Sequence, residues 1–425
     1  MSSQPICAVR NAALLDNFQQ TRALTLALAA PLSDADATVQ SMEDASPSKW
    51  HMAHTSWFFE TFILRDHVAG YQPFDENFAF LFNSYYEAEG ERHDRCQRGM
   101  ITRPALDEVR AYRAHVDSAI AANFDALPDD ALTLLELGVH HEQQHQELFQ
   151  TDILHLLSRN PLKPALWPTP RRLHNAATAP LQWIEGKSGI VDLGHDGGSF
   201  AYDCEGPRHQ MLLTPHALAS RCVTNGEWKE FLAAGGYDEP RHWLSDGWAW
   251  VQGNNIRAPL YWTQDGDWAQ FGNDGMQPID DAAPVCHVSL YEADAFASWA
   301  GARLPTEPEW ESAAAALDAH SGNQLDAAGA IRPAPAPTSA KAGDGLAQMF
   351  GDVWEWTGSA FRPYPGFKPA DGAVGEYNGK FMSGQFVLKG GSCATPRGHV
   401  RACYRNFFYP HQRWQYTGVR LAKDI

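Results

Sequence analysis

A proline-rich stretch between Ser158 and Pro180 separates two halves of the chain that differ in character. Before it, long segments combine helix-forming residues with apolar side chains three and four positions apart, whereas after it tryptophan and glycine become frequent. A chain of 425 residues is also too long for one ordinary hydrophobic core. We therefore predict two domains, residues 1–158 and 183–425, joined by an ordered linker at residues 159–182.

The first half is predicted to form a four-helix bundle. Three of its helical segments read LLDNFQQTRALTLAL, PALDEVRAYRAHVDSAIAANF and ALTLLELGVHHEQQHQELFQTDILHLL, with Pro and Gly breaks between them. We expect the first helix to start near Cys7 and another to run through WHMAHTSWFFETFIL. The remaining two helices follow Pro104 and Asp129.

The second half is predicted to be an irregular, loop-rich domain. Short strand-like runs alternate there with turn signals such as GHDGGSF, DGW and NDG. The alanine- and proline-rich tract at residues 330–343 is expected to be a surface loop. The whole chain is therefore assigned to the α+β class.

Composition and charge exclude several classes of function. The formal net charge of -18 disfavours a nucleic-acid or anionic-membrane partner, because both require clustered Lys and Arg. We find neither a signal-peptide pattern nor an apolar window long enough to span a bilayer, so we expect a cytoplasmic protein with small-molecule ligands. The seven scattered cysteines include no C-x-x-C pair, which argues against a disulfide framework or a cysteine-based zinc site.

The segment HHEQQHQE at residues 140–147 has the spacing of a helical metal site. Residues four apart on an α-helix lie about 40° apart around its axis, so His141 and His145 project from one face. Gln144 borders that face, while Glu147 points elsewhere and is expected to have a supporting or structural role. The alternative is a solvated helix face on which the two histidines fall together by chance.

A metal ion needs a third ligand, and the segment SPSKWHMAHTSWFFE offers His51 and His54. Either one could instead be a core histidine with a satisfied N–H group. Metal sites in bundles take their ligands from facing helices. Three neutral imidazoles suit Fe(II), Zn(II) or Cu(II) and leave coordination positions open for other molecules.

These motifs together resemble one enzyme family. SPSKWHMAHTSWFFETFIL and HHEQQHQELFQTDILH resemble the DinB-like domain of the ergothioneine-biosynthesis sulfoxide synthases (EgtB type). VTNGEW, APVCHVSLYEADAFASWAGARLPTEPEWE, GDVWEWT, LKGGSCATP and GVRLA resemble the formylglycine-generating-enzyme domain, a C-type-lectin-like fold. The resemblance spans both domains and keeps the family's order of motifs.

The resemblance implies a non-haem Fe(II) enzyme that uses O2 to couple a thiol to C2 of the imidazole of hercynine, giving a sulfoxide. It implies that His54, His141 and His145 bind the iron, with His54 as the last residue of the family's W-x-x-A-H stretch. Binding both substrates at one metal would remove most of the entropic cost of bringing them together.

The resemblance also assigns a proton donor. In this family a tyrosine delivers a proton, with an electron, to the iron-bound oxygen species, which suppresses dioxygenation of the thiol. The segment FLFNSYYEAEGERH contains the candidates Tyr85 and Tyr86. The alternative for both is ordinary aromatic packing within the bundle.

Hercynine combines a carboxylate with a trimethylammonium group, so its pocket should offer hydrogen-bond donors and aromatic faces. The segment YRNFFYPHQRWQYTGVR contains both kinds of residue. By resemblance, Asn406 binds the carboxylate and Gln144 approaches the imidazole. Phe407, Phe408 and Trp414 are candidates for the ammonium group, with core packing as the alternative.

The sequence departs from the family at the donor site. The branch that uses γ-glutamylcysteine has Asp and Arg where this chain has Phe408 and Gln412, which favours a smaller donor such as cysteine and leaves Gln412 as a substrate-binding candidate. Selenoneine synthases (SenA type) share the architecture and take a seleno-sugar, so sulfur and selenium donors both stay open. The run ERHDRCQRGMITRP offers arginines for a donor carboxylate, and we select Arg98 from Arg92, Arg95, Arg98 and Arg103.

Other classes of function stay open. The second half alone could belong to a formylglycine-generating oxidase or to a non-catalytic, lectin-like binding module. The oxidase has cysteine where GVRLA has Leu421, and Cys393 and Cys403 remain as possible substitutes. A binding module would not need the histidine triad. A zinc-dependent thiol transferase of DinB type would use the same three histidines and would act without O2.

Overall fold

The computed structural model describes residues 4–169, 180–337, 345–371, 375 and 378–425, with side chains described from residue 12 onward. The chain forms two compact units. Unit 1 comprises residues 1–161 with two short segments from later in the chain, and unit 2 comprises the remainder. No helix in the described ranges is long and apolar enough to cross a membrane.

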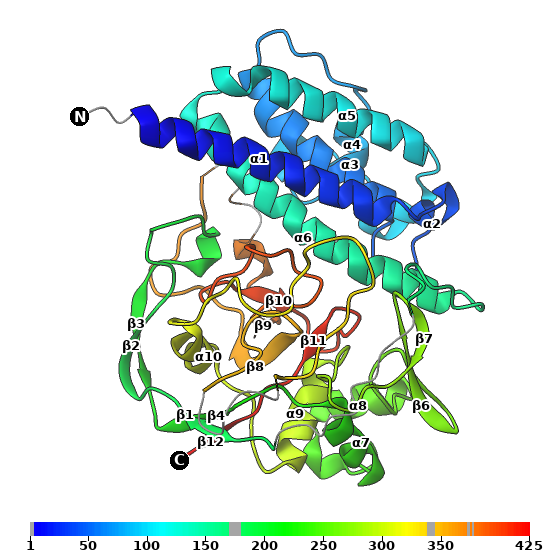
Figure 1. Ribbon diagram of the computed structural model, residues 1–425, viewed down its shortest axis with the longest axis vertical. Coiled ribbons are helices and arrows are strands. Elements are labelled where there is room, and N and C mark those ends of the chain that lie inside the picture. The colour runs from blue at the N-terminus through cyan, green and yellow to red at the C-terminus, as the bar shows by residue number, and fades with distance from the viewer. Residues whose placement is uncertain (1–3, 170–179, 338–344, 372–374, 376–377) are drawn as a thin grey trace. The chain divides into compact units, whose positions relative to one another are not determined.

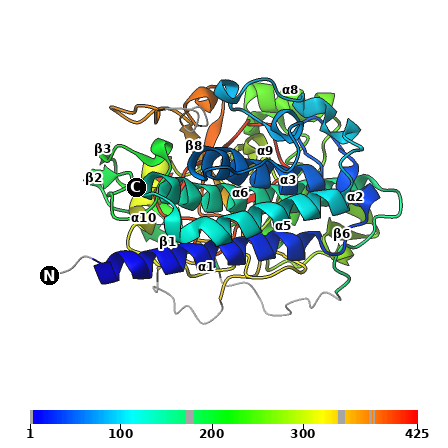
Figure 2. The same ribbon diagram turned by 90° about the horizontal axis from the view of Figure 1, so that it is seen from above.

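Unit 1 is helical (Figures 1 and 2). Its elements are α1 (Gln4–Ala29), α2 (Asp34–Thr38), α3 (Ser48–Phe59), the π-helix η1 (Glu60–Arg65), α4 (Phe78–Phe82), the 3-10 helices η2 (Glu87–Glu89) and η3 (Arg95–Met100), α5 (Leu106–Asn123), the 3-10 helix η4 (Phe124–Ala126) and α6 (Asp129–Arg159). The four predicted helices correspond to α1, α3 with η1, α5 and α6. Both α1 and α3 pack against α5 and α6.

Helix α6 begins and ends where its sequence favours a terminus. Pro128 precedes it in an extended conformation, and Asp129 and Asp130 occupy its first turn. Their carboxylates lie at the positive end of the helix dipole, whereas Arg159 lies at the negative end. The helix therefore starts at the predicted residue and passes through the whole HHEQQHQE segment without interruption.

Helix α3 is the central element of unit 1. All of its residues from Ser48 to Phe59 are buried, and it contacts α2, α4, α5 and α6. Pro47 precedes the first turn, where the N–H that proline lacks would have no partner in the helix. Because α3 is enclosed on every side, both His51 and His54 lie in the interior.

Unit 2 combines small sheets with short helices (Figure 1). Its strands are β1 (Trp183–Glu185), β2 (Gly189–Leu193), β3 (His209–Leu213), β4 (His216–Ala219), β5 (Trp262–Asp265), β6 (Asp267–Gly272), β7 (Gly275–Pro278), β8 (Trp354–Ala360), β9 (Phe386–Lys389), β10 (Asn406–Phe408), β11 (Thr417–Gly418) and β12 (Ala422–Asp424). Its α-helices are α7 (Asn225–Ala233), α8 (Ser245–Gly253), α9 (Leu290–Trp299) and α10 (Glu307–Ala314), and its 3-10 helices are η5 (Asp203–Glu205), η6 (Pro240–His242) and η8 (Gly379–Phe381).

The largest sheet has the strand order β10-β9-β8-β11, in which only the β8–β11 pair is parallel. The other described sheets are β1-β4-β12, β2-β3 and β5-β6-β7. Tryptophans from the quoted motifs fill the core, because Trp228, Trp310, Trp354 and Trp356 are almost completely buried. The tryptophans of these sequence motifs therefore form part of the hydrophobic core of unit 2.

Helices α7, α9 and α10 start with the same local device. A Ser or Thr at the N-cap accepts a hydrogen bond from the backbone N–H of a glutamate three residues later, and that glutamate bonds back to the cap. The pairs are Thr224 with Glu227, Ser289 with Glu292, and Thr306 with Glu309.

The predicted α+β class is confirmed, with a helical N-terminal domain followed by a domain of short strands and loops. Residues 331–337 of the alanine- and proline-rich tract contain neither helix nor strand and are mostly half-buried. Residues 338–344 of that tract, residues 170–179 of the predicted linker and the side chain of Cys7 lie outside the described residues.

Candidate metal centre

Three histidine side chains meet between α3 and α6. His54 comes from α3, whereas His141 and His145 lie one turn apart on α6. Each offers one ring nitrogen, and these three atoms lie within 4.8 Å of one another. A metal with bonds of about 2.1 Å separates neighbouring ligand atoms by roughly 3–3.5 Å, so small side-chain rotations would complete the site.

The hydrogen bond to His54 determines which nitrogen faces the centre. Its Nδ1 lies 2.6 Å from the carbonyl oxygen of Phe82, which can only accept, so Nδ1 carries the proton. The lone pair is therefore on Nε2, as a metal ligand requires. The donor set of three imidazoles fits Fe(II), Zn(II) or Cu(II).

Burial keeps the three imidazoles neutral. Burial, followed by repulsion from His141, holds the pKa of His54 well below its ordinary range, and the same two causes lower that of His145. Burial also lowers the pKa of His141 to about 4, against a small opposing effect of Glu142. Because a metal binds only the unprotonated imidazole, the apoprotein already has its ligands in the binding form at neutral pH.

The His54 ring lies between two tryptophans. Trp50 stacks on it with ring centroids 4.6 Å apart and an interplanar angle of 13°, and Trp57 stacks on it at 5.6 Å and 14°. Arg98 places its guanidinium carbon 3.3 Å from the ring centroid of Trp50. These contacts restrain the orientation of the His54 ring.

Arg98 is buried and is bound by serines. Its Nη1 donates to Ser46 Oγ at 2.9 Å, and its Nη2 donates to Ser84 Oγ at 3.2 Å. Burial, followed by repulsion from Arg95, lowers the pKa of Arg98 to about 9, so the side chain is still charged at neutral pH. Its role in binding a donor carboxylate stays a prediction.

The two candidate tyrosines occupy different environments. The ring of Tyr86 is buried against Trp57, at a centroid distance of 5.5 Å, and against Phe62 at 5.2 Å. Tyr85 is half-buried, and its hydroxyl accepts a hydrogen bond of 2.6 Å from Arg95 Nη1. Tyr86 therefore contacts a tryptophan that stacks on His54, whereas Tyr85 is oriented by an arginine.

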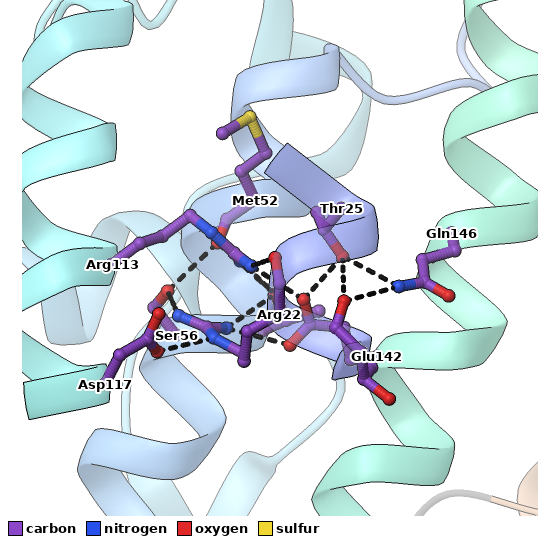
Figure 3. Close-up of polar contacts among 10 residues, drawn as sticks. Arg22, Thr25, Met52, Ser56, Arg113, Asp117, Glu142 and Gln146 are labelled. Atoms are coloured by element: carbon purple, nitrogen blue, oxygen red, sulfur yellow. Dashed lines mark hydrogen bonds and ion pairs between the residues drawn. The ribbon is translucent and has the colours of Figure 1, made fainter. Parts of the chain in front are cut away.

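A buried ionic network lies on another face of α6 (Figure 3). The Glu142 carboxylate accepts hydrogen bonds from Arg22 and Arg113, both at 2.8 Å, and from Thr25 at 2.6 Å. Burial alone would raise the pKa of Glu142, but the charges of Arg113 and Arg22 outweigh it and lower the pKa to about 2.

The same two arginines connect α1 and α5 to the helix of His54 (Figure 3). Arg22 donates to Ser56 Oγ at 2.8 Å, and Arg113 donates to the carbonyl oxygen of Met52 at 3.0 Å. The network therefore fixes α3 and α6, the two helices that provide the ligands, with respect to each other.

The predicted substrate-binding residues lie in both units. Gln144 is half-buried on α6, and Glu147, which was expected only in a supporting or structural role, is half-buried there too. Asn406, Phe407 and Phe408 form β10 of unit 2, where the Phe407 ring stacks on Phe361 at a centroid distance of 4.2 Å.

Gln412 and Trp414 follow β10 and are buried. Gln412 Oε1 accepts a hydrogen bond of 2.9 Å from the backbone N–H of Tyr409, and the Trp414 ring contacts Phe408 edge-on at 5.9 Å. The assignment of all these residues to substrate binding stays a prediction.

Among the residues around the triad, the sequence indicated His51 only as an alternative ligand and gave no role to Asp152 or Glu142. His51 lies 2.9 Å from His145, between their Nδ1 atoms, and its Nε2 lies 3.0 Å from Asp152 Oδ2. The signal for Asp152 was available, because it follows His145 by seven residues and so lies on the same face of α6. The sequence shows that Glu142 is a carboxylate within the histidine motif. It does not indicate that Arg22 and Arg113 are the hydrogen-bond partners of Glu142.

The cysteines of unit 2 do not have the character of reactive thiols. Cys393 and Cys403 are buried and unbridged, as are the other described cysteines of this unit. Burial, followed by the neighbouring Glu205 carboxylate, raises the pKa of Cys403 above its ordinary range, and Cys403 Sγ lies 2.9 Å from Glu205 Oε2. Reactive cysteines require a lowered pKa, so this pair is a poor substitute for an oxidase cysteine pair.

Comparisons with known proteins define the class. Residues 17–149 match the DinB superfamily, and residues 187–425 match the sulfatase-modifying factor enzyme 1-like domain. The chain is therefore a two-domain protein in which a DinB domain with a histidine triad precedes a sulfatase-modifying-factor-like domain. This combination confirms the resemblance noted in the sequence.

Individual relatives define the family. Hercynine oxygenase of Mycolicibacterium smegmatis is 34% identical over 97% of this chain and 99% of its own length. The chain belongs to the hercynine oxygenase family. Ergothioneine biosynthesis protein 1 of Schizosaccharomyces pombe is 27% identical over 53% of this chain and 28% of its own length, and a formylglycine-generating enzyme of Thermomonospora curvata is 28% identical over 54% of this chain and 89% of its own length.

Proposed function

We propose that this protein catalyses formation of a carbon–sulfur or carbon–selenium bond at C2 of the hercynine imidazole, using Fe(II) and O2. With a thiol donor, hercynine, the thiol and O2 would give a sulfoxide and one molecule of water. The observation that supports this most directly is the triad of His54, His141 and His145, two of them buried and His145 half-buried, in a chain of the hercynine oxygenase family.

The three histidines would bind the iron on one side. Fe(II) in this position would supply open coordination sites for the sulfur or selenium of the donor and for O2. The protein's contribution is to present three neutral imidazoles with restrained rings. Burial and the stacking of Trp50 and Trp57 on His54 both support that role.

A tyrosine of the FNSYYE segment would deliver a proton during turnover. Tyr85 has a hydroxyl oriented by Arg95, and Tyr86 packs against the tryptophan that stacks on His54. The packing of Tyr86 supports a position near the metal for that residue, whereas the bond to Arg95 supports a fixed orientation of the Tyr85 hydroxyl.

The proposed contacts with hercynine follow from the chemistry of each of its groups. Gln144 borders the ligand face of α6 and would approach the imidazole, while Asn406 would bind the carboxylate. The trimethylammonium group would meet aromatic faces, for which Phe407, Phe408 and Trp414 are the candidates.

The donor would be cysteine or a seleno-sugar rather than γ-glutamylcysteine. Phe408 and Gln412 offer no charge to a second carboxylate, which supports a smaller donor. Arg98 is charged and contacts Trp50, the stacking partner of His54, and this supports a role in binding an anionic group of the donor.

The test is anaerobic reconstitution with Fe(II), followed by O2, hercynine and one donor at a time: cysteine, γ-glutamylcysteine or a seleno-sugar. Mass spectrometry of the products identifies the new bond. We expect a hercynine adduct with cysteine or with the seleno-sugar and little with γ-glutamylcysteine. No adduct from any donor would overturn the proposed substrate.

The same assay separates the two alternative catalytic functions. Turnover with Zn(II) in the absence of O2 would indicate a thiol transferase of DinB type. Conversion of the cysteine in a sulfatase peptide to formylglycine would indicate an oxidase, and the buried Cys403 with its raised pKa argues against that outcome.

A further inference from the structure

A chain of buried hydrogen bonds leads from a carboxylate to one of the three candidate ligands. Asp152 Oδ2 lies 3.0 Å from His51 Nε2, and His51 Nδ1 lies 2.9 Å from His145 Nδ1. His51 and Asp152 are both at least 95% buried, at 3% and 5% exposed. Neither residue belongs to the group of three that can offer a nitrogen to a shared metal.

The Asp152 carboxylate determines which atoms donate and which accept in this chain of hydrogen bonds. The same Asp152 oxygen accepts a hydrogen bond of 2.8 Å from the backbone N–H of Ser46, so it acts as an acceptor and His51 Nε2 must donate to it. The other ring nitrogen of His51, Nδ1, is then the one that accepts. Because two nitrogens 2.9 Å apart share one proton, His145 Nδ1 is the donor.

The consequence for His145 is a fixed tautomer. With its proton on Nδ1, the lone pair lies on Nε2, the atom that remains to bind a metal. His54 reaches the same tautomer through the carbonyl oxygen of Phe82. Different groups therefore fix the tautomers of the two candidate ligands. The His51 imidazole, which bonds to Asp152, fixes that of His145, whereas the backbone carbonyl of Phe82 fixes that of His54.

We propose that His51 is a positioning residue for the metal centre, and that Asp152 fixes its orientation so that His145 presents Nε2. This inference rests on the proposed assignment of a metal to His54, His141 and His145. In general, removing such a partner of a ligand lowers metal affinity about 10–100-fold. His51 acts through His145 and does not itself bind the metal.

The experiment compares two substitutions that differ by one methylene group. In His51→Asn the amide oxygen can occupy the place of Nδ1 and still accept from His145. In His51→Gln the polar group is displaced towards the place of Nε2 and cannot reach His145. The control is His155→Gln, the same substitution at another histidine of unit 1. His155 lies ten residues after His145 on α6, and its ring hydrogen-bonds to Ser41 Oγ at 2.7 Å instead of to one of the three candidate ligands.

The measured quantity is the affinity of the full-length protein for Co(II) alone, by anaerobic titration, together with the ligand-field absorption of the bound ion. We expect His51→Gln to lose about 10–100-fold in affinity and to change the spectrum. His51→Asn and His155→Gln should stay within a few-fold of the wild type. Far-UV circular dichroism of each apoprotein checks the fold.

Asp152→Asn provides a second, independent measurement. It keeps an acceptor oxygen near Ser46 and His51 but removes the charge, so it should weaken Co(II) binding less than His51→Gln does. Asp152→Ala, which leaves His51 without its acceptor, should weaken it more than Asp152→Asn.

The outcomes separate the positioning role from the metal site itself. Wild-type affinity and spectrum in His51→Gln would overturn the positioning role while leaving the three-histidine site intact. Equal losses in His51→Asn and His51→Gln would overturn it in favour of a packing role. A wild-type protein that binds no metal would overturn the site and the positioning role together.

Discussion

The imidazoles of His54 and His141 are buried in unit 1 and that of His145 is half-buried, and this burial penalises their charged form. A solvated helix face, the alternative suggested by so polar a segment, would leave them exposed and free to protonate near pH 6.5. Burial instead lowers the pKa of each one, to about 4 for His141. Three neutral nitrogens that converge without a metal are a costly arrangement, which supports a binding function.

We predict that His141→Ala abolishes Fe(II) binding and turnover, because two imidazoles cannot replace a three-ligand set. The helical signal in far-UV circular dichroism should be unchanged, since alanine favours the helix. Metal analysis after reconstitution measures the effect. Full activity in this variant would show that His141 is not a ligand.

Two further substitutions at this scale identify the proton donor. Tyr85→Phe and Tyr86→Phe each remove one hydroxyl and keep the ring, so packing against Trp57 and Phe62 is preserved at Tyr86. One variant should divert the product from the hercynine adduct towards the sulfinic acid of a thiol donor, as measured by mass spectrometry. If both variants keep the wild-type product ratio, neither tyrosine is the donor.

At the scale of elements, α6 presents two different faces. His141 and His145 point to the candidate metal centre together with His54 of α3, whereas Glu142 and Gln146 bond to α1, where Gln146 donates to the carbonyl oxygen of Thr21 at 2.8 Å. The Glu142 network with Arg22 and Arg113 connects α1, α3, α5 and α6 (Figure 3). A displacement of α6 would therefore disturb both faces together.

We predict that Glu142→Gln destabilises unit 1 by about 3–5 kcal/mol, because the buried guanidinium of Arg113 loses its ion-pair partner and that of Arg22 keeps only its pair with Asp117. Urea unfolding followed by circular dichroism measures the loss. The matched control is Glu76→Gln, since Glu76 is exposed in the same unit and the substitution is the same. Equal stability of the two variants would mean that the network contributes little to the fold.

At the scale of the whole molecule, stability should depend on pH through a buried acid of unit 2. Asp352 accepts hydrogen bonds from the backbone N–H of Ala334 at 2.7 Å and from Asn323 Nδ2 at 2.8 Å. Burial raises its pKa from 3.8 to about 6 in spite of these bonds. The folded state therefore binds this proton more tightly than the unfolded chain does.

The free energy of unfolding should consequently fall as the pH rises from about 4 to about 6, by about 3 kcal/mol from this group, and stay level above that range. Asp352→Asn removes the ionisation but keeps an acceptor oxygen, and asparagine tolerates the backbone φ of 58°. Urea unfolding at several pH values should give a smaller slope for the variant. Identical slopes would contradict the shifted pKa of Asp352.

Much of the candidate site could be predicted from the sequence, because the relevant information is local. The spacing of His141 and His145 fixes their common face on any α-helix, and Pro104, Pro128 and Asp129 mark helix starts. The capping pairs of α7, α9 and α10 are also legible as short patterns. The motifs in their order further identified the family.

The sequence by itself thus determined the α+β class, the family and the two histidines of α6, since each depends on spacing or on short motifs. The resemblance favoured His54 over His51, and the tertiary structure adds that His54, not His51, lies in the cluster with His141 and His145, although both are buried on α3. Only the tertiary structure revealed the partners of Glu142 and the chain from Asp152 through His51 to His145. Those contacts join residues distant along the chain, and no local pattern specifies which buried polar groups will pair.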